Sequence, residues 1–186
     1  MKEKVLLFSL CEKTYPSIEK EFLIIDNIAK QLDEITEPKI IKAKKTAIVK
    51  ARSVKEGEIV DTRPRVEVDG KIYTFSETKQ KVTKEMVDNG AVVVINPDGE
   101  HYIIKNEEKF AQKYQLTDDG FVAISDEQLF RKTIVDCIIT ASWGEKQYVP
   151  KGSYICVTNP SDIYSVTNSA FESTYSVKNK DELFTF

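Results

Sequence analysis

KGSYICVTNPSDIYSVTNSAFESTY, residues 151–175, has nearly the same pattern as NGAVVVINPDGEHYIIKNEEKFAQKY, residues 89–114. In both stretches a glycine precedes an apolar run, an Asn-Pro pair follows, and a second apolar run leads to Phe and Tyr spaced four apart. Asn-Pro favours a turn, and Phe-x-x-x-Tyr places two rings on one face of a helix. Each copy is therefore predicted to form a strand, a turn, a second strand and a short helix. The paired positions are Gly90 with Gly152, Asn96-Pro97 with Asn159-Pro160, Tyr102 with Ile163 and Tyr164, Phe110 with Phe171, and Tyr114 with Tyr175.

A second similarity lies upstream of each copy. KTAIVKA at residues 45–51 resembles RKTIVDC at residues 131–137, which adds an opening strand and a variable insert to each copy. One such unit alone would have too little core to be stable. The sequence therefore predicts an α+β fold in which two small duplicated strand-hairpin-short helix units pack as one pseudo-twofold body. The predicted divisions are an N-terminal strand and helix at 1–38, a first repeat with a hairpin insert at 39–116, and a second repeat at 117–186.

The remaining segments are predicted from local patterns. Residues 5–11 are predicted to form a strand and residues 17–36 a helix, because apolar residues recur at helical spacing after Ser17. Residues 39–54 are predicted to hold two strands or one bent strand, and Asp69-Gly70 is expected to turn the hairpin 66–75. Short helices are expected at 83–88 and 126–130, at 106–113 after an Asn106 cap, and after a cap at Thr167 or Asn168.

The second copy resembles the PGDYG-type domain, a family named after a Pro-Gly-Asp-Tyr-Gly motif. Gly152-Ser153-Tyr154 stands where the family has Gly-Asp-Tyr, although Pro150 lies one residue too early and no glycine follows Tyr154. The closing Phe-x-x-x-Tyr fits both copies, and the first copy keeps only Gly90 of the motif itself. The resemblance covers roughly residues 39–177 as two copies. It implies a compact α+β domain, found largely in phage and bacterial proteins of unassigned function, and it implies no catalytic residue.

The composition excludes several classes of protein. The chain has 186 residues, 41% hydrophobic and 31% charged, with a formal net charge of -3, which is unlike a disordered chain or a strongly basic nucleic-acid binder. Three cysteines without CxxC spacing argue against a disulfide framework or a structural zinc site, and Cys137 and Cys156 are expected to be small buried hydrophobes. No run of about 20 apolar residues is present to span a membrane, so a cytoplasmic location is expected.

The sequence shows little machinery for catalysis. His101 is the only histidine, no Ser or Cys lies in a nucleophile-elbow pattern, and no phosphate-binding glycine-rich loop is present. No cofactor and no metal are therefore expected. A magnesium site built from Asp61, Glu67 and Asp69 remains an open alternative.

One segment has a skewed charge. Residues 39–52 contain six Lys and Arg residues and no acid. On alternating strands these side chains would project away from the apolar ones, and this face is interpreted either as a solvated, aggregation-blocking surface or as an anion site. Trp143, in a predicted loop, is expected either to cover the core or to stack on a base. The candidate ligand-binding residues are Lys42, Lys44, Lys50, Arg52, Trp143 and Tyr154.

Three functions follow from these features. The first is a non-catalytic, phage-related binding protein that holds a small anionic or nucleotide-like ligand between the two repeats. The second is a protein-interaction or structural module that binds a partner chain or another copy of itself. The third is a carboxylate-dependent hydrolase or transferase acting on nucleotides. Nucleic acid stays open as a partner, and a membrane is not expected to be one.

Overall fold

The computed structural model describes residues 1–9, 17–61, 65–68, 71–74, 79–97, 99–142, 144 and 146–178. Within these residues the chain forms eighteen strands and only four short helices. The predicted α+β class is therefore wrong, and the fold is mainly β. The prediction erred because several segments that look helical or irregular by local pattern are strands that pair with distant parts of the chain.

The strands form three larger sheets and one small one among the described residues. The six-stranded sheet has the order β15-β14-β2-β1-β7-β6. It contains β1 (Lys2–Ser9), β2 (Ser17–Ile24), β6 (Arg65–Val68), β7 (Lys71–Thr74), β14 (Cys137–Thr140) and β15 (Lys146–Val149). The small sheet pairs β5 (Ile59–Asp61) with β8 (Lys79–Lys81).

Two five-stranded sheets form the rest of the β structure. The first has the order β10-β9-β4-β12-β11 and the second β17-β16-β13-β3-β18. The first contains β4 (Ile48–Ser53), β9 (Val92–Ile95), β10 (His101–Ile104), β11 (Tyr114–Thr117) and β12 (Gly120–Ala123). The second contains β3 (Ile41–Lys45), β13 (Gln128–Lys132), β16 (Tyr154–Cys156), β17 (Tyr164–Val166) and β18 (Tyr175–Val177).

Each five-stranded sheet takes strands from both halves of the chain. β12 belongs to the predicted second repeat yet pairs with β4 of the first. β3 belongs to the predicted first repeat yet pairs with β13 of the second. The predicted self-contained repeat units are therefore not what the structure shows, and the sheets cross the predicted boundary at residue 116. The two five-stranded sheets nevertheless have one corresponding connection between strands. A helix joins β10 to β11 in the first sheet, as another joins β17 to β18 in the second.

The pairing register shows which positions of the two sheets correspond. Ser53 lies opposite Val92 in the first sheet, and Lys132 lies opposite Tyr154 in the second. Gly90 and Gly152 each precede these partners by two residues, and both have a positive φ, which glycine adopts without strain. The predicted equivalence of 45–51 with 131–137 is wrong, because the register instead matches Ser53 with Lys132.

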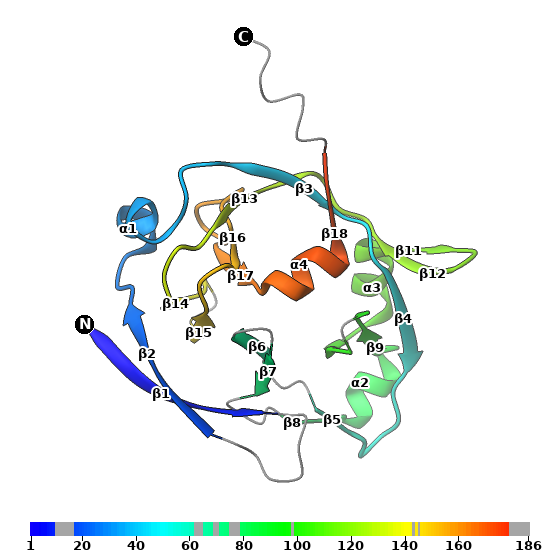
Figure 1. Cartoon of the computed structure of the whole chain (residues 1–186). Coiled ribbons are helices and arrows are strands. Elements are labelled where there is room, and N and C mark those ends of the chain that lie inside the picture. The colour runs from blue at the N-terminus through cyan, green and yellow to red at the C-terminus, as the bar shows by residue number, and fades with distance from the viewer. Residues whose placement is uncertain are drawn as a thin grey trace.

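α3 (Glu107–Lys113) and α4 (Asn168–Thr174) lie on the inner side of a curved wall to which β3 and β4 belong (Figure 1). Figure 1 shows β3 and β4 along its rim, with both helices inside. Phe110 of α3 packs with Val49 in one cluster, and Phe171 of α4 packs with Phe130 in another. Both phenylalanines therefore anchor hydrophobic clusters of the core.

The helix ends follow their local sequence signals. Asn106 caps α3 and Thr167 caps α4, each by accepting a hydrogen bond from a backbone N–H three residues on. Thr83 does the same for α2 (Lys84–Asp88), as expected. Tyr114 follows α3, and its hydroxyl is hydrogen-bonded to that of Tyr102.

The N-terminal segment departs most from prediction. Residues 17–24 form β2, which pairs along its length with β1, and only Ile28–Ile35 form a helix, α1, capped by Asn27. The helix predicted at 17–36 is thus wrong in its first half, because β-sheet pairing overrides the local apolar spacing. The helix predicted at 126–130 is also wrong, since these residues run into β13 between β3 and β16. The predicted hairpin 66–75 is present as β6 and β7, while its turn at 69–70 lies outside the described residues.

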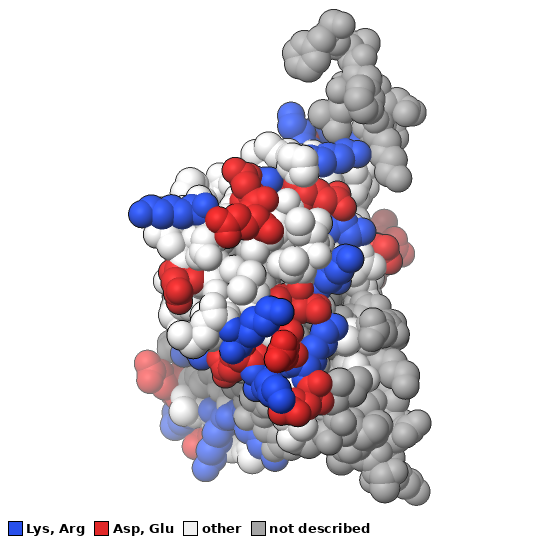
Figure 2. Space-filling model, turned by 60° about the vertical axis from the view of Figure 1, so that its left-hand side comes forward, with Lys and Arg blue, Asp and Glu red and all other residues white. Residues whose placement is uncertain are grey.

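The β1–β2 hairpin connects the two halves. β1 pairs with β7, from the insert of the first half, and β2 pairs with β14, from the insert of the second. On the side that carries α1 and this hairpin, basic and acidic side chains are interspersed (Figure 2). Cross-strand pairs such as Lys2–Glu21 at 3.9 Å and Lys4–Glu19 at 3.8 Å fit that mixture. Among the described helices, none has the length and apolar character needed to cross a membrane.

Candidate functional site

The basic strand residues lie on the outer face of the wall. Burial alternates along β3 and β4, where Ala43 and Val49 face the helices while Lys42, Lys44 and Lys50 are exposed. This is the alternation expected from the sequence. The three lysines therefore point away from the interior rather than into a space between the two halves.

Arg52 is engaged by a neighbour. Its guanidinium forms a two-pronged ion pair with the Glu58 carboxylate, and the Glu58 carboxylate also accepts the backbone N–H of Lys55 at 3.1 Å. The hydrogen bond from Arg52 lowers the pKa of Glu58, and the same contact raises the pKa of Arg52. Arg52 thus fixes the loop after β4.

Tyr154 lies on the opposite, inner face. Its ring is stacked on that of Phe171 with a centroid distance of 3.8 Å, and the Lys132 ammonium lies over it at 5.6 Å. Trp143, the remaining candidate, lies outside the described residues. The structure therefore does not bring the described candidates together, because a sheet separates Tyr154 from the lysines of β3 and β4.

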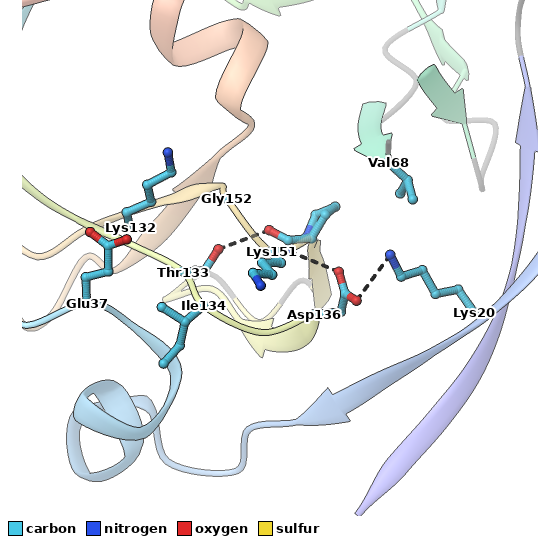
Figure 3. A pocket seen from close by; sticks show the side chains of 10 residues that line it. Lys20, Glu37, Val68, Lys132, Thr133, Ile134, Asp136, Lys151 and Gly152 are labelled. Carbon is cyan, nitrogen blue, oxygen red and sulfur yellow. Dashed lines mark hydrogen bonds and ion pairs between the residues drawn. The ribbon is translucent and has the colours of Figure 1, made fainter. Parts of the chain in front are cut away.

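A different pocket is present near the second half. It has a volume of about 470 Å³ and lies where β2, β6, the segment after β13 and the turn before β16 meet. Its side chains, drawn in Figure 3, come from five separate parts of the chain, the fifth being Glu37 just after α1. We call it the lysine pocket, after three of its lining residues. It is lined by Lys20, Glu37, Val68, Lys132, Thr133, Ile134, Asp136, Pro150, Lys151 and Gly152.

A buried threonine, Thr133, fixes the backbone beside the lysine pocket through hydrogen bonds. The Thr133 hydroxyl, with the residue only 2% exposed, donates to the Pro150 carbonyl at 3.0 Å and lies 3.2 Å from the Ser153 carbonyl. The backbone N–H of Gly152 donates to the Thr133 carbonyl, and that of Thr133 to the Ser153 carbonyl. These bonds fix the turn that carries Lys151. Because the backbone N–H groups of Thr133 and Gly152 already donate hydrogen bonds within the protein, an anion here would be held by ammonium groups rather than by these N–H donors.

Asp136 joins the two walls of the pocket. One carboxylate oxygen accepts the backbone N–H of Lys151 at 2.9 Å, and the other lies 3.1 Å from the Lys20 ammonium. The side chains of Lys20 and Asp136 are each 25% exposed, so their attraction is less screened than that of a surface pair. The contact ties the N-terminal hairpin to the second half (Figure 3).

The other two lysines are not neutralised by a carboxylate, although the Lys132 ammonium lies over the Tyr154 ring. Within the part of the chain that the structure describes, neither Lys132 nor Lys151 forms an ion pair with a carboxylate. The pocket lining thus holds three ammonium groups against two carboxylates, those of Glu37 and Asp136. This arrangement favours a ligand with negative charge.

The corresponding place in the first half is built differently. By register, Ser53 takes the place of Lys132, Val54 that of Thr133, and Asn89 that of Lys151. Val54 is buried in a cluster with Val60, Val82 and Met86, and a Cβ on Gly90 would lie 2.9 Å from the Cβ of Glu107. Only the second half therefore combines lysines with an open space at this position.

Other chemistry is sparse in the described part of the chain. It contains no group of three or more His, Cys, Asp or Glu side chains able to hold a metal ion. Cys137 and Cys156 are buried free thiols, as predicted. Burial raises the pKa of Cys137 to about 12, which leaves it protonated and poorly nucleophilic at neutral pH.

Comparison with known proteins yields no relative. No family model matches the chain, and neither a curated protein nor a solved structure was found to be similar. The resemblance to the PGDYG-type domain stays a prediction. The segment that carries this resemblance contributes Gly152 to the lysine pocket and Tyr154 to the hydrophobic cluster around Phe130 and Phe171.

Sequence reasoning missed most of the pocket. The local pattern predicts a helix around Lys20, whereas the structure has a strand there. Lys20 reaches Asp136 because that strand, β2, pairs with β14. One signal was present: the second repeat has lysine at 151 where the first has Asn89, directly before the matched glycines.

Proposed function

We propose that this chain is a non-catalytic binding protein that holds a small anionic molecule in the lysine pocket. The observation that carries the proposal is the pair of lysines, Lys132 and Lys151, that line an open space without a carboxylate partner among the described residues. Its volume of about 470 Å³ lies in the range typical of small-molecule sites. The matched positions of the first half hold Ser53 and Asn89 instead of lysines. The local backbone therefore does not require lysines at these positions, which favours a role in ligand binding over a purely structural one.

Three features support binding rather than catalysis. The backbone around the pocket is internally hydrogen-bonded, the thiol of Cys137 is buried and protonated, and His101 lies on β10, outside the pocket lining. A ligand would therefore be oriented by charge and would meet no activated nucleophile from the lining. The protein would sequester, sense or carry the ligand.

Calorimetric titration with inorganic phosphate tests the proposal. Replacing Lys151 with alanine should weaken binding about tenfold or more, because a charge-assisted hydrogen bond contributes roughly 1.5–3 kcal/mol. Lys50→Ala is the matched control, since Lys50 is an exposed lysine on the outer face, and it should change the affinity less than about twofold. Failure of the wild-type chain to bind phosphate at millimolar concentration would refute the proposal, as would equal losses in the two variants.

A further inference from the structure

The ligand class can be narrowed further, on the assumption that the proposed anion binding is correct. The lining alternates donors and acceptors along the pocket. In Figure 3, Lys132 lies beside Glu37 at one end and Lys20 beside Asp136 at the other, with Lys151 between them. An ammonium group suits a phosphate, whereas a carboxylate accepts hydrogen bonds from hydroxyl or amine groups.

Both carboxylates retain accepting capacity. Each oxygen of Asp136 has one described partner, the Lys151 amide or the Lys20 ammonium. A carboxylate offers about four lone-pair directions, so further hydroxyl donors fit. Glu37 is exposed at the other end of the lining. A purely anionic ligand would meet repulsion at both carboxylates, while one that also carries hydroxyl groups would satisfy them.

The pocket offers no flat ring for a nucleobase. Among the residues that the structure describes, its lining contains no Phe, Tyr, Trp or Arg, and the apolar contribution comes from Val68, Ile134 and Pro150. The Tyr154 ring, which the lining residue Lys132 contacts, is already stacked on Phe171 and covered by the Lys132 ammonium. Base recognition normally uses a stacking surface of this kind, and here it is occupied.

We infer that the lysine pocket takes a phosphorylated polyol, such as a sugar phosphate, and that it does not read a nucleobase. The phosphate binds Lys151, and the hydroxyl groups bind Asp136 and Glu37, while Lys132 stays over the Tyr154 ring and adds positive charge at the Glu37 end (Figure 3). The pocket volume of about 470 Å³ exceeds what a lone phosphate fills, which leaves room for a sugar.

Calorimetry on the full chain with three probes tests this inference: inorganic phosphate, ribose 5-phosphate and adenosine 5′-monophosphate. Ribose 5-phosphate should bind about tenfold more tightly than phosphate, because two or more hydroxyl hydrogen bonds are added. The adenosine nucleotide should bind within about threefold of ribose 5-phosphate, since its base finds no stacking partner. Glu37→Ala should reduce the advantage of ribose 5-phosphate over phosphate by roughly threefold or more, while Glu34→Ala, at an exposed position of α1, should preserve it.

The outcomes separate the two claims. If the adenosine nucleotide binds more than about tenfold tighter than ribose 5-phosphate, the base is recognised and the inference is wrong, while anion binding stands. If ribose 5-phosphate binds no better than phosphate, the hydroxyl groups are not recognised and the inference is again wrong. If none of the three probes binds, the proposed function itself fails.

Discussion

Replacing Asp136 with asparagine should affect stability and phosphate affinity in opposite directions. Asparagine keeps the shape of the side chain and an oxygen that can accept the Lys151 amide. It removes the negative charge that lies 3.1 Å from the Lys20 ammonium. The variant should therefore lose the ion pair that stabilises the N-terminal hairpin against the second half, which lowers its free energy of unfolding. The net charge of its pocket should become more positive.

The magnitudes follow from burial and distance. With both partners 25% exposed, loss of the ion pair should cost about 1 kcal/mol of unfolding free energy. For a phosphate bound roughly 8 Å from the removed charge, with an effective dielectric constant of about 20–40, Coulomb's law gives about 1–2 kcal/mol of recovered attraction. Phosphate should then bind roughly 5–30-fold more tightly, and the gain should shrink as sodium chloride is added.

The assay pairs urea denaturation of the ligand-free protein with calorimetric titration of phosphate. Asp33→Asn is the control, because Asp33 forms an ion pair with Arg131 at 2.6 Å yet is absent from the pocket lining. It should leave phosphate affinity unchanged. Weaker phosphate binding in Asp136→Asn would refute the reasoning, since it would mean that the carboxylate helps to hold the anion or that the pocket collapses without it.

Three further predictions concern the fold. Gly120→Ala should destabilise the protein by about 2 kcal/mol or more in urea denaturation, because φ is +139° and the added Cβ would lie 2.8 Å from Cγ2 of Ile48. Glu58 has a lowered pKa through its hydrogen bond from Arg52, so its contribution to stability is full above the unfolded pKa near 4.5 and is lost as pH falls through the lower folded value. The stability difference between wild type and Glu58→Gln should therefore be largest near neutral pH and shrink as the pH falls below 4.5. Cys137, whose pKa is raised to about 12 by burial, should resist iodoacetamide at pH 8 in the folded protein and react after denaturation, as read by peptide mass spectrometry.

Each of these three predictions has a contradicting result. Gly57→Ala is the matched control for Gly120→Ala, because Gly57 also has a positive φ but open space around the added Cβ. Equal losses in the two glycine variants would show that the contact with Ile48 is unimportant. A stability difference for Glu58→Gln that does not change between neutral pH and acid pH would disprove the assigned origin of the shift. Rapid native labelling of Cys137 would contradict its burial.

The locally encoded parts of the fold were predictable from sequence. Thr83, Asn106 and Thr167 are cap residues followed by short helices, and the structure confirms all three. The alternation of basic and apolar residues at 41–52 correctly indicated strand structure with exposed lysines. These features depend on neighbours within a few residues, so a single sequence contains the information.

The parts that failed depend on distant partners. The run around Phe22 has helical spacing, yet it is a strand because β1 lies beside it and β14 continues the sheet. Residues 128–132 are a strand because β3, some 85 residues earlier by the pairing of Gln128 with Ala43, lies alongside. The repeat pattern itself did not reveal that strands cross between the halves, since the same local signals suit either arrangement.

The candidate site was missed for the same reason. Lys20, Asp136 and Lys151 meet only because the N-terminal hairpin, the segment after β13 and the turn before β16 are brought together by the six-stranded sheet. The basic segment at residues 39–52 forms β3 and β4, and its lysines at 42, 44 and 50 are exposed on the outer face. A row of like charges in the sequence showed which residues are solvated, but it did not show where a cavity lies.

The central claim is that the lysine pocket, and not the basic outer strand, binds the anion. An amide NMR titration of the isotopically labelled full chain with inorganic phosphate tests it most directly, because it reports both surfaces in one experiment. We predict saturable shifts concentrated at residues 132–136 and 151–152, with little change along 42–52. Shifts confined to Lys42, Lys44 and Lys50, with the amides of the pocket unchanged, would contradict the account.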